Sequence, residues 1–363
     1  MDTDDLRLQR WGDVDDGYLG PAFHMRFKPG QVLYGSRRTY LRKVAIADFE
    51  GICANTTFVL EPSSADLLPE FLPQVMSTER FHDHSVQQSK GSVNPYINFR
   101  DLTWFEFALP PAKHQWSIVK VLECARQAAH EAAQVRTALE SLKDALIDDA
   151  TWDSSCGRWS VPLVRVGDLL DGTPRNGLSP KASSEPDGVR SVTLSAVRDG
   201  RFTADEDTEK WCEPSSKAPE FRVDAGDVFI VRGNGNRSLV GRAGLALVKP
   251  EPACIYPDLL IRLRFDELRI DPFLATALWN FRRVHRRLLG RAKSSNGIYK
   301  VNGKDISSHE LPVPPAAESR ALLTRLRAID ELQTLCKVHA VAAGKLMSAL
   351  REKVLRPDGV HDV

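Results

Sequence analysis

The chain has 363 residues, of which 42% are hydrophobic and 27% charged, and its 49 Lys and Arg side chains nearly balance 48 Asp and Glu side chains. This length suffices for two or three domains with cores of their own, and the composition excludes a disordered or collagen-like chain. No run reaches the ~18 consecutive apolar residues of a membrane span, and the acidic residues 2–5 do not resemble the start of a signal peptide. We expect a cytoplasmic protein without a membrane partner.

The six cysteines, at positions 53, 124, 156, 212, 254 and 336, form no Cys-x-x-Cys pair and share no metal-ligand spacing with histidine. This pattern argues against a zinc site and against a disulfide framework. The net charge of +1 excludes a uniformly basic DNA-coating protein, but it averages over local basic segments. We expect no metal site.

The chain contains an internal duplication. Residues 29–33 resemble residues 225–229 at an offset of 196, and residues 90–111 resemble residues 294–315 at an offset of 204. Each copy of the second pair ends in two consecutive prolines. The eight additional residues of the second copy fit in loops between matching elements.

A long helix is predicted after each Pro-Pro pair, because apolar or small side chains recur there at steps of three and four residues. Each helix would have about 35 residues and a length of roughly 50 Å. A single apolar stripe of that length needs a partner, and its own duplicate is the nearest one. We therefore expect the two helices to pair as a coiled coil; the alternative is two independent surface helices, each packed on its own domain.

The side chains expected to pack in this helix pair are Ile118, Leu122, Ala125, Ala129, Leu139, Leu142 and Leu146 in the first helix, and Leu322, Leu326, Ile329, Leu346 and Leu350 in the second.

The segment between the helices combines short apolar stretches with Gly, Pro, Ser and Asn clusters, which indicates strands and turns, and a helix is predicted within 272–291. The first 111 residues repeat the later part of this unit, so the first copy lacks about 38 residues at its front by comparison with the second. The sequence thus predicts an α+β chain with mixed α/β domains and long helices. The expected segments are 1–111, 112–150 (long helix), 151–315, 316–356 (long helix) and a tail, 357–363.

This order of unit, long helix, unit and long helix resembles the specificity subunit of a type I restriction–modification system. The resemblance is carried by 30–37 (GQVLYGSR), by its repeat at 226–233 (GDVFIVRG), by 159–169 (WSVPLVRVGDL), and by the segments 109–111 and 313–315 that lead into the helices. It covers nearly the whole chain. The opening strands of the first recognition domain are missing from the pattern, which we attribute either to a start codon further upstream or to a naturally shortened gene.

The resemblance implies two target-recognition domains, each reading one half of a split double-stranded DNA target. It implies two helices that pack antiparallel as a spacer and dock two DNA methyltransferase subunits, with restriction or translocase subunits in the full complex. It also implies that this subunit has no catalytic residues and binds no cofactor.

Basic and polar side chains gather in segments that could reach DNA. Base reading requires Arg, Lys, Asn, Gln or Ser on loops, and further basic side chains contact phosphates. Candidate loops are 36–43 and 232–238, then 87–94 and 293–300. Within the basic run 282–293, one face of a helix would carry Arg282, Arg283, Arg286 and Arg287. The alternatives are solvated turns, ordinary hairpin loops and a solvated helix face.

The residues predicted to contact DNA are Ser36, Arg37, Arg38, Tyr40, Arg42, Lys43, Lys90 and Asn94 in the first copy, and Arg232, Asn234, Asn236, Arg237, Arg242, Arg283, Arg287, Arg291, Lys293, Ser294, Asn296, Tyr299 and Lys300 in the second.

Enzyme motifs are incomplete or missing in this sequence. Residues 94–96 (NPY) lack one proline of the Asn-Pro-Pro-Tyr motif of amino methyltransferases, and no glycine-rich loop suits S-adenosylmethionine or a nucleotide. No histidine accompanies a Gly-x-Ser-x-Gly nucleophile motif. We expect a non-catalytic, sequence-specific DNA-reading adaptor; the alternative is a helical protein-interaction scaffold without DNA readout.

Overall fold

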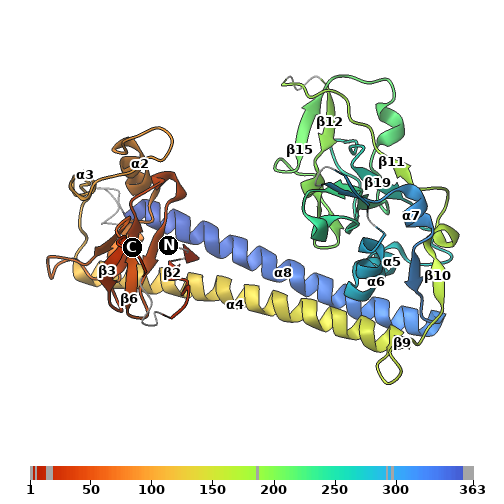
Figure 1. Ribbon diagram of the computed structural model, residues 1–363, viewed down its shortest axis with the longest axis horizontal. Coiled ribbons are helices and arrows are strands. Elements are labelled where there is room, and N and C mark those ends of the chain that lie inside the picture. Colours follow the sequence, from red (N-terminus) through yellow and green to blue (C-terminus); the bar gives the residue numbers. More distant parts are fainter. Residues whose placement is uncertain are drawn as a thin grey trace. The chain divides into compact units, whose positions relative to one another are not determined.

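The computed structural model describes residues 3–4, 6–13, 19–184, 188–291, 293–295 and 298–354. The chain forms two compact units, Met1–Arg136 with Thr334–Val363, and Thr137–Gln333 (Figure 1). Helix α4, Ala112–Thr151, and helix α8, Ala316–Val354, each contribute to both units.

Both long helices begin directly after a Pro-Pro pair. Proline is tolerated at a helix start because its missing N–H would have no partner there. Helix α4 contains neither glycine nor proline in 40 residues, and the 39 residues of α8 contain only Gly344. Nothing in the sequence therefore interrupts either helix over about ten turns.

The two helices pack against each other in antiparallel orientation. In the first unit, Leu122 and Ala125 of α4 are buried with Met347 of α8. In the second unit, the amide of Gln333 in α8 donates a hydrogen bond of 2.7 Å to the carboxylate of Glu140 in α4. Late residues of α8 thus meet early residues of α4, and the predicted fold class is confirmed (Figure 1).

Two of the predicted packing residues lie outside the helix contact. Leu142 and Leu346 are each 48% exposed, whereas Met347, which the periodicity did not select, is buried. An α-helix has 3.6 residues per turn, so a stripe extended by fixed steps drifts around the helix. The prediction was wrong for these two residues; the other ten are buried or half-buried.

The first unit is built on a five-stranded sheet in the order β1-β2-β5-β4-β7, with β3 and β6 paired separately. Side chains alternate across the central strand β4, with Val32 and Tyr34 in one core and Leu33 in another. Its other elements are β1 Thr3–Asp4, β2 Arg7–Leu8, β3 Phe23–Phe27, β4 Val32–Gly35, β5 Val44–Ile46, β6 Gly51–Ala54, β7 Thr57–Leu60, the 3-10 helix η1 Thr39–Leu41, α1 Leu72–Val75, α2 Glu79–Gln87 and α3 Phe99–Leu102.

The second unit contains a six-stranded sheet in the order β11-β19-β16-β18-β14-β13, and its main core joins this sheet to α5, α6, α4 and α8. Its strands are β8 Trp152–Asp153, β9 Arg158–Trp159, β10 Leu163–Arg165, β11 Arg175–Asn176, β12 Val189–Val192, β13 Val197–Arg198, β14 Arg201–Phe202, β15 Glu209–Cys212, β16 Val228–Val231, β17 Gly233–Asn234, β18 Ala243–Leu245, β19 Leu260–Leu263, β20 Lys293–Ser295, β21 Ile298–Lys300 and β22 Glu310–Pro312. Its helices are η2 Val166–Leu169, η3 Leu194–Ala196, η4 Ala218–Phe221, η5 Arg237–Leu239, α5 Pro272–Asn280, α6 Arg282–Leu289 and α7 Gly303–Ser307.

The two units repeat one sheet. The order β1-β2-β5-β4-β7 corresponds to β13-β14-β18-β16-β19, with the same parallel contact between β2 and β5 as between β14 and β18. On the central strands, Val32 lies opposite residues 46 and 60, and Val228 lies opposite residues 245 and 263. The offset thus increases from 196 at β16 to 199 at β18 and 203 at β19, which places most of the additional residues in the loops on either side of β18. Within the described residues, β11 has no counterpart in the first unit.

Two buried histidines lie in the second unit. Nε2 of His285 lies 2.8 Å from the carbonyl oxygen of Val240, and the ring of His309 meets that of Trp279 edge-on. Burial, reinforced by neighbouring arginines, lowers the pKa of His285 to about 4 and that of His309 to about 3. Both rings are therefore neutral in the folded chain near pH 7.

The helix contact predicts different costs for two leucines. We expect Leu326→Ala, which removes a buried side chain from the main core of the second unit, to lower the free energy of unfolding by ~2–5 kcal/mol. The matched control Leu142→Ala, on an exposed position, should change it by less than ~0.5 kcal/mol. Urea unfolding followed by circular dichroism measures both. Equal losses would contradict the helix contact described here.

The buried histidines predict acid sensitivity. Their pKa values are lower in the folded than in the unfolded chain, where histidine titrates near ~6.5, so the unfolded state binds more protons below that pH. The stabilisation is intact above pH 6.5 and decreases as the pH falls, by about 2 kcal/mol per histidine at pH 5.

The variant His285→Gln keeps a donor for Val240, and it should reduce the loss of stability between pH 7.5 and pH 5 by about that amount. Urea unfolding at the two pH values measures this loss, and His114→Gln, on an exposed position, serves as the control. An unchanged pH dependence in His285→Gln would refute the assignment.

Candidate nucleic-acid interface

The structure brings the two candidate loops of the second unit into one small sheet. Strand β17 follows β16 after one residue and pairs with β21, which pairs in turn with β20. We call β17, β20 and β21, with the turn 235–238, the loop sheet. The segments 232–238 and 293–300, about 60 residues apart in the sequence, therefore form one surface. The sequence predicts them as two separate loops.

Asparagine side chains shape the turn of the loop sheet. Oδ1 of Asn234 accepts a hydrogen bond of 2.8 Å from the backbone N–H of Asn236. Oδ1 of Asn236 accepts bonds from the N–H and the hydroxyl of Ser238, at 3.0 and 2.8 Å, and thereby caps η5. These two oxygens hold the loop's conformation, which leaves residues 235–239 exposed.

Arg237 is the exposed cation of this turn. Its guanidinium lies over the ring of Tyr299, 5.5 Å from the centroid, and donates to the carbonyl of Leu289 at 3.3 Å. Arg232 is half-buried and donates to the carbonyl of Asp258 at 3.4 Å. The loop sheet thus presents one arginine stacked on an aromatic ring and a second arginine close to its base.

The first unit has the same arrangement at the matching place. Arg37 and Lys90 each form a β-bridge with Tyr96, and the Arg37 guanidinium lies over the Tyr96 ring, again 5.5 Å from the centroid. The bridge of Arg37 with Tyr96 corresponds to the pair of Gly233 with Lys300 in β17 and β21, at the offsets 196 and 204 of the sequence repeat. Each unit therefore carries an arginine over a tyrosine beside this bridge, although the repeat aligns neither Arg37 with Arg237 nor Tyr96 with Tyr299.

The other predicted residues of the first unit have different surroundings. Ser36 is buried and donates to the carbonyl of Thr56 at 2.8 Å, so its hydroxyl cannot reach DNA. Arg42 pairs with Glu79 at 2.5 Å, and Lys90 pairs with Asp101 at 2.9 Å. The hydrogen bonds from Lys90 and Asn98 lower the pKa of the Asp101 carboxyl. The predicted residues Arg38, Tyr40 and Asn94 are exposed, and Lys43 is half-buried.

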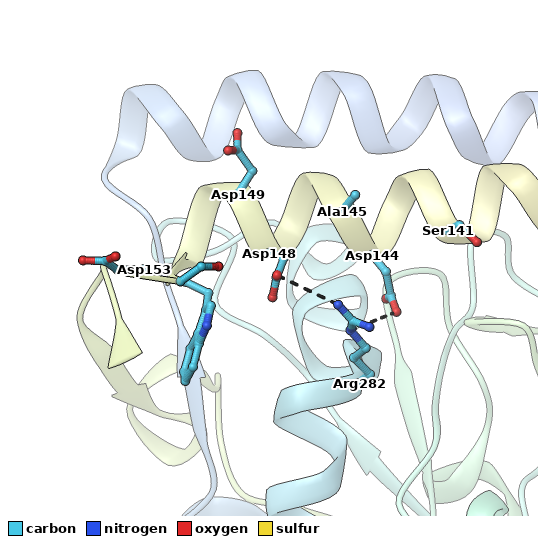
Figure 2. A pocket seen from close by; sticks show the side chains of 9 residues that line it. Ser141, Asp144, Ala145, Asp148, Asp149, Asp153 and Arg282 are labelled. Carbon is cyan, nitrogen blue, oxygen red and sulfur yellow. Dashed lines mark ion pairs between the residues drawn. The ribbon is translucent and has the colours of Figure 1, made fainter. Parts of the chain in front are cut away.

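The basic face predicted on α6 is largely neutralised. Arg282 lies 3.7 Å from Asp144 and 3.9 Å from Asp148 of α4 (Figure 2). Arg283 pairs with Asp148 at 2.7 Å and stacks on Trp152, 4.2 Å from the ring centroid.

Arg287 of the same helix pairs with Glu310 of β22 at 2.7 Å. Three of the four arginines of the predicted face thus fix α6 to acidic residues, on α4 135 residues away for Arg283 and on β22 23 residues away for Arg287. A uniformly basic, DNA-facing helix is therefore not what the structure shows. Arg282 and Arg286 are the exposed members of this group.

The remaining predicted residues lie near the loop sheet. Arg291 donates to the carbonyl and hydroxyl of Ser308, and Arg242 donates to the carbonyls of Ser238 and Asn280. Lys293 and Ser294 belong to β20, and Lys300 is exposed on β21. Asn296 lies outside the described residues.

No helix in the described part of the chain is long and apolar enough to cross a membrane. Among the same residues, no group of three His, Cys, Asp or Glu side chains could hold a metal ion, and the six cysteines are free thiols.

Two curated relatives match part of the chain. It is 28% identical over 153 residues to the type I restriction enzyme EcoKI specificity subunit of Escherichia coli (strain K12), which covers 42% of this chain and 32% of the relative. It is 34% identical over 110 residues to the type I restriction enzyme EcoDI specificity subunit of Escherichia coli, which covers 30% of this chain and 24% of the relative. The matched segments thus span a third or less of each relative's length. No family model matches the chain.

Solved structures share the fold over most of the chain. The S subunit of a type I restriction–modification system from M. genitalium superposes with a TM-score of 0.56 at 12% identity, over 91% of this chain and 83% of that one. A chain from a structure of type I R-M complex assembly and conformational transition gives a TM-score of 0.53 at 19% identity, over 94% and 85% of the two chains. These motifs, sequence matches and shared fold confirm the resemblance: in sequence over part of its length, and in fold over most of it, this chain is similar to the specificity subunits of type I restriction–modification systems.

Proposed function

We propose that this chain is a DNA-reading specificity subunit of a type I restriction–modification complex. The observation that supports this best is the repeated arginine over a tyrosine, Arg37 on Tyr96 and Arg237 on Tyr299, beside the matching bridge of each unit. A duplicated protein that reads a split target needs two equivalent surfaces, one for each half-site. Segments 1–111 and 151–315 are then the target-recognition domains.

The chemistry of these surfaces suits double-stranded DNA. Arginine binds guanine edges and phosphates in a bidentate manner, and a guanidinium stacked on an aromatic ring is held ready for such contacts. The residues of this proposed interface are Arg37, Arg38, Tyr40, Asn94, Arg232, Arg237, Tyr299 and Lys300. Binding would then be strongly salt-dependent, because phosphate contacts release counterions.

The long helices, segments 112–150 and 316–356, would be the spacer and the docking surface for methyltransferase subunits. Apolar side chains that the helix pair does not bury support this role, among them Leu335 at 54% and Val338 at 57% exposure on α8. Restriction or translocase subunits would be further members of the full complex. In this assignment the chain supplies recognition, and chemistry belongs to its partners.

The same exposed apolar residues also favour the second candidate, a helical scaffold that binds proteins but does not read DNA. The two functions differ in what the loop sheet does. In a scaffold its arginines would be dispensable, whereas in a specificity subunit they would determine the target.

We expect Arg232→Ala/Arg237→Ala to abolish recognition of one half-site and to leave methyltransferase docking intact, because contacts to one base pair are worth ~1–3 kcal/mol each. Target methylation by the reconstituted complex and a gel-shift assay at two salt concentrations measure this. The matched control is Lys210→Ala/Lys217→Ala, which removes two positive charges from exposed positions outside the loop sheet. Unchanged methylation by the double variant would refute the assignment, and no DNA binding by the intact complex would favour the scaffold.

A further inference from the structure

A cavity of about 730 Å³ lies within the second unit, beside the loop sheet. It is lined by parts of α4, the turn between β13 and β14, η5 and α5. Four cationic side chains from different elements line it: Lys143 of α4, Arg198 of β13, Arg242, which follows η5, and Arg282 of α6. Its size lies within the range of ordinary ligand sites.

Of these four cations, Arg282 pairs with Asp144 and Asp148, and the described residues offer the other three no ion pair. Arg242 is half-buried, and its two hydrogen bonds, both of 3.2 Å, go to the uncharged carbonyls of Ser238 and Asn280. Burial lowers the pKa of Arg242, although Asp144 and Glu140 oppose that effect.

The acidic side chains around the cavity have other partners or lie at its edge. Asp144 pairs with Arg282 at 3.7 Å, and Glu140 accepts the hydrogen bond from Gln333 of α8. Asp199 is exposed on the turn between β13 and β14. With Arg282 and Asp144 paired, the lining keeps three cations, Lys143, Arg198 and Arg242, against the carboxylates of Glu140 and Asp199. Arg198 is exposed, whereas Lys143 and Arg242 are half-buried, and a partly desolvated cation without a close counter-ion is unfavourable.

We propose that this cavity binds a phosphate group held by Lys143, Arg198 and Arg242. A phosphate offers several acceptor oxygens, which suits one ammonium and two guanidinium groups that approach from different elements. The source can be a DNA backbone or a free phosphate; the DNA source rests on the proposed function. In that case the spacer helix itself contacts the target strand through Lys143, beside the loop sheet.

The test uses the full chain and two double variants. Lys143→Gln/Arg198→Gln removes two of the three cations; Arg242 is retained because its bonds to Ser238 and Asn280 hold the fold. The control Lys210→Gln/Lys217→Gln removes the same charge from exposed positions of the second unit that do not line the cavity. Thermal unfolding is measured with sodium pyrophosphate and with sodium chloride at equal ionic strength, and a gel shift measures affinity for duplex DNA.

We expect pyrophosphate to raise the unfolding midpoint of the wild type and of the control, and not that of the cavity variant, because a ligand stabilises only a state that binds it. If the source is DNA, the cavity variant also loses at least about tenfold in DNA affinity, and duplex DNA removes the effect of pyrophosphate. If the source is a free phosphate, only the pyrophosphate effect is lost.

Equal stabilisation of both variants, or none of the wild type, overturns the cavity assignment. If the cavity variant binds DNA as well as the wild type does, and pyrophosphate stabilises neither protein, the cavity assignment is refuted while the proposed function stands. Stabilisation by pyrophosphate without any DNA binding by the complex refutes the proposed function while the cavity stands.

Discussion

The fold depends on the burial of one apolar stripe of α4 against one of α8. A helix of about ten turns with a single apolar face is not stable alone in water, because most helix stability in proteins comes from packing. In each unit the pairing supplies this packing, through Leu122 and Met347 in the first and through Ile147 and Leu326 in the second. The recognition elements of the second unit are attached to the same core, since α5, α6 and the six-stranded sheet pack against it.

Duplication explains why the candidate DNA surface occurs twice. The central strands β4 and β16 pair with their neighbours in the same register. After each of these strands the chain enters a candidate loop, which forms a β-bridge with a residue in or directly beyond the second candidate loop of the same unit. The stacked arginine is supplied by different loop positions, Arg37 directly after β4 and Arg237 within η5. The arrangement is retained although the loops differ in length and sequence, as expected if each copy reads a different half-site.

Features with a short-range signal could be predicted from the sequence. The Pro-Pro pairs mark the starts of both long helices, the three- and four-residue steps identify their packing faces, and the repeated segments locate equivalent strands. The drift of the helix stripe was missed at Leu142 and Leu346, because small deviations from a fixed period accumulate over many turns.

Long-range pairs had no such signal. Asp148 and Arg283 are 135 residues apart, so nothing in the basic run indicated that its arginines have carboxylate partners. The cavity beside the loop sheet was missed for the same reason, because its four cations come from separate elements. The candidate loops were found by composition, but only the structure unites them in one sheet and separates exposed side chains such as Arg237 from buried ones such as Ser36.

The proposal that two equivalent surfaces read DNA can be tested by selecting bound sequences from a random double-stranded library with the intact chain in its methyltransferase complex. The account predicts enriched sequences with two short conserved blocks separated by a fixed number of unconserved base pairs, one block for each unit. Retention of the library without enrichment of any sequence would contradict it.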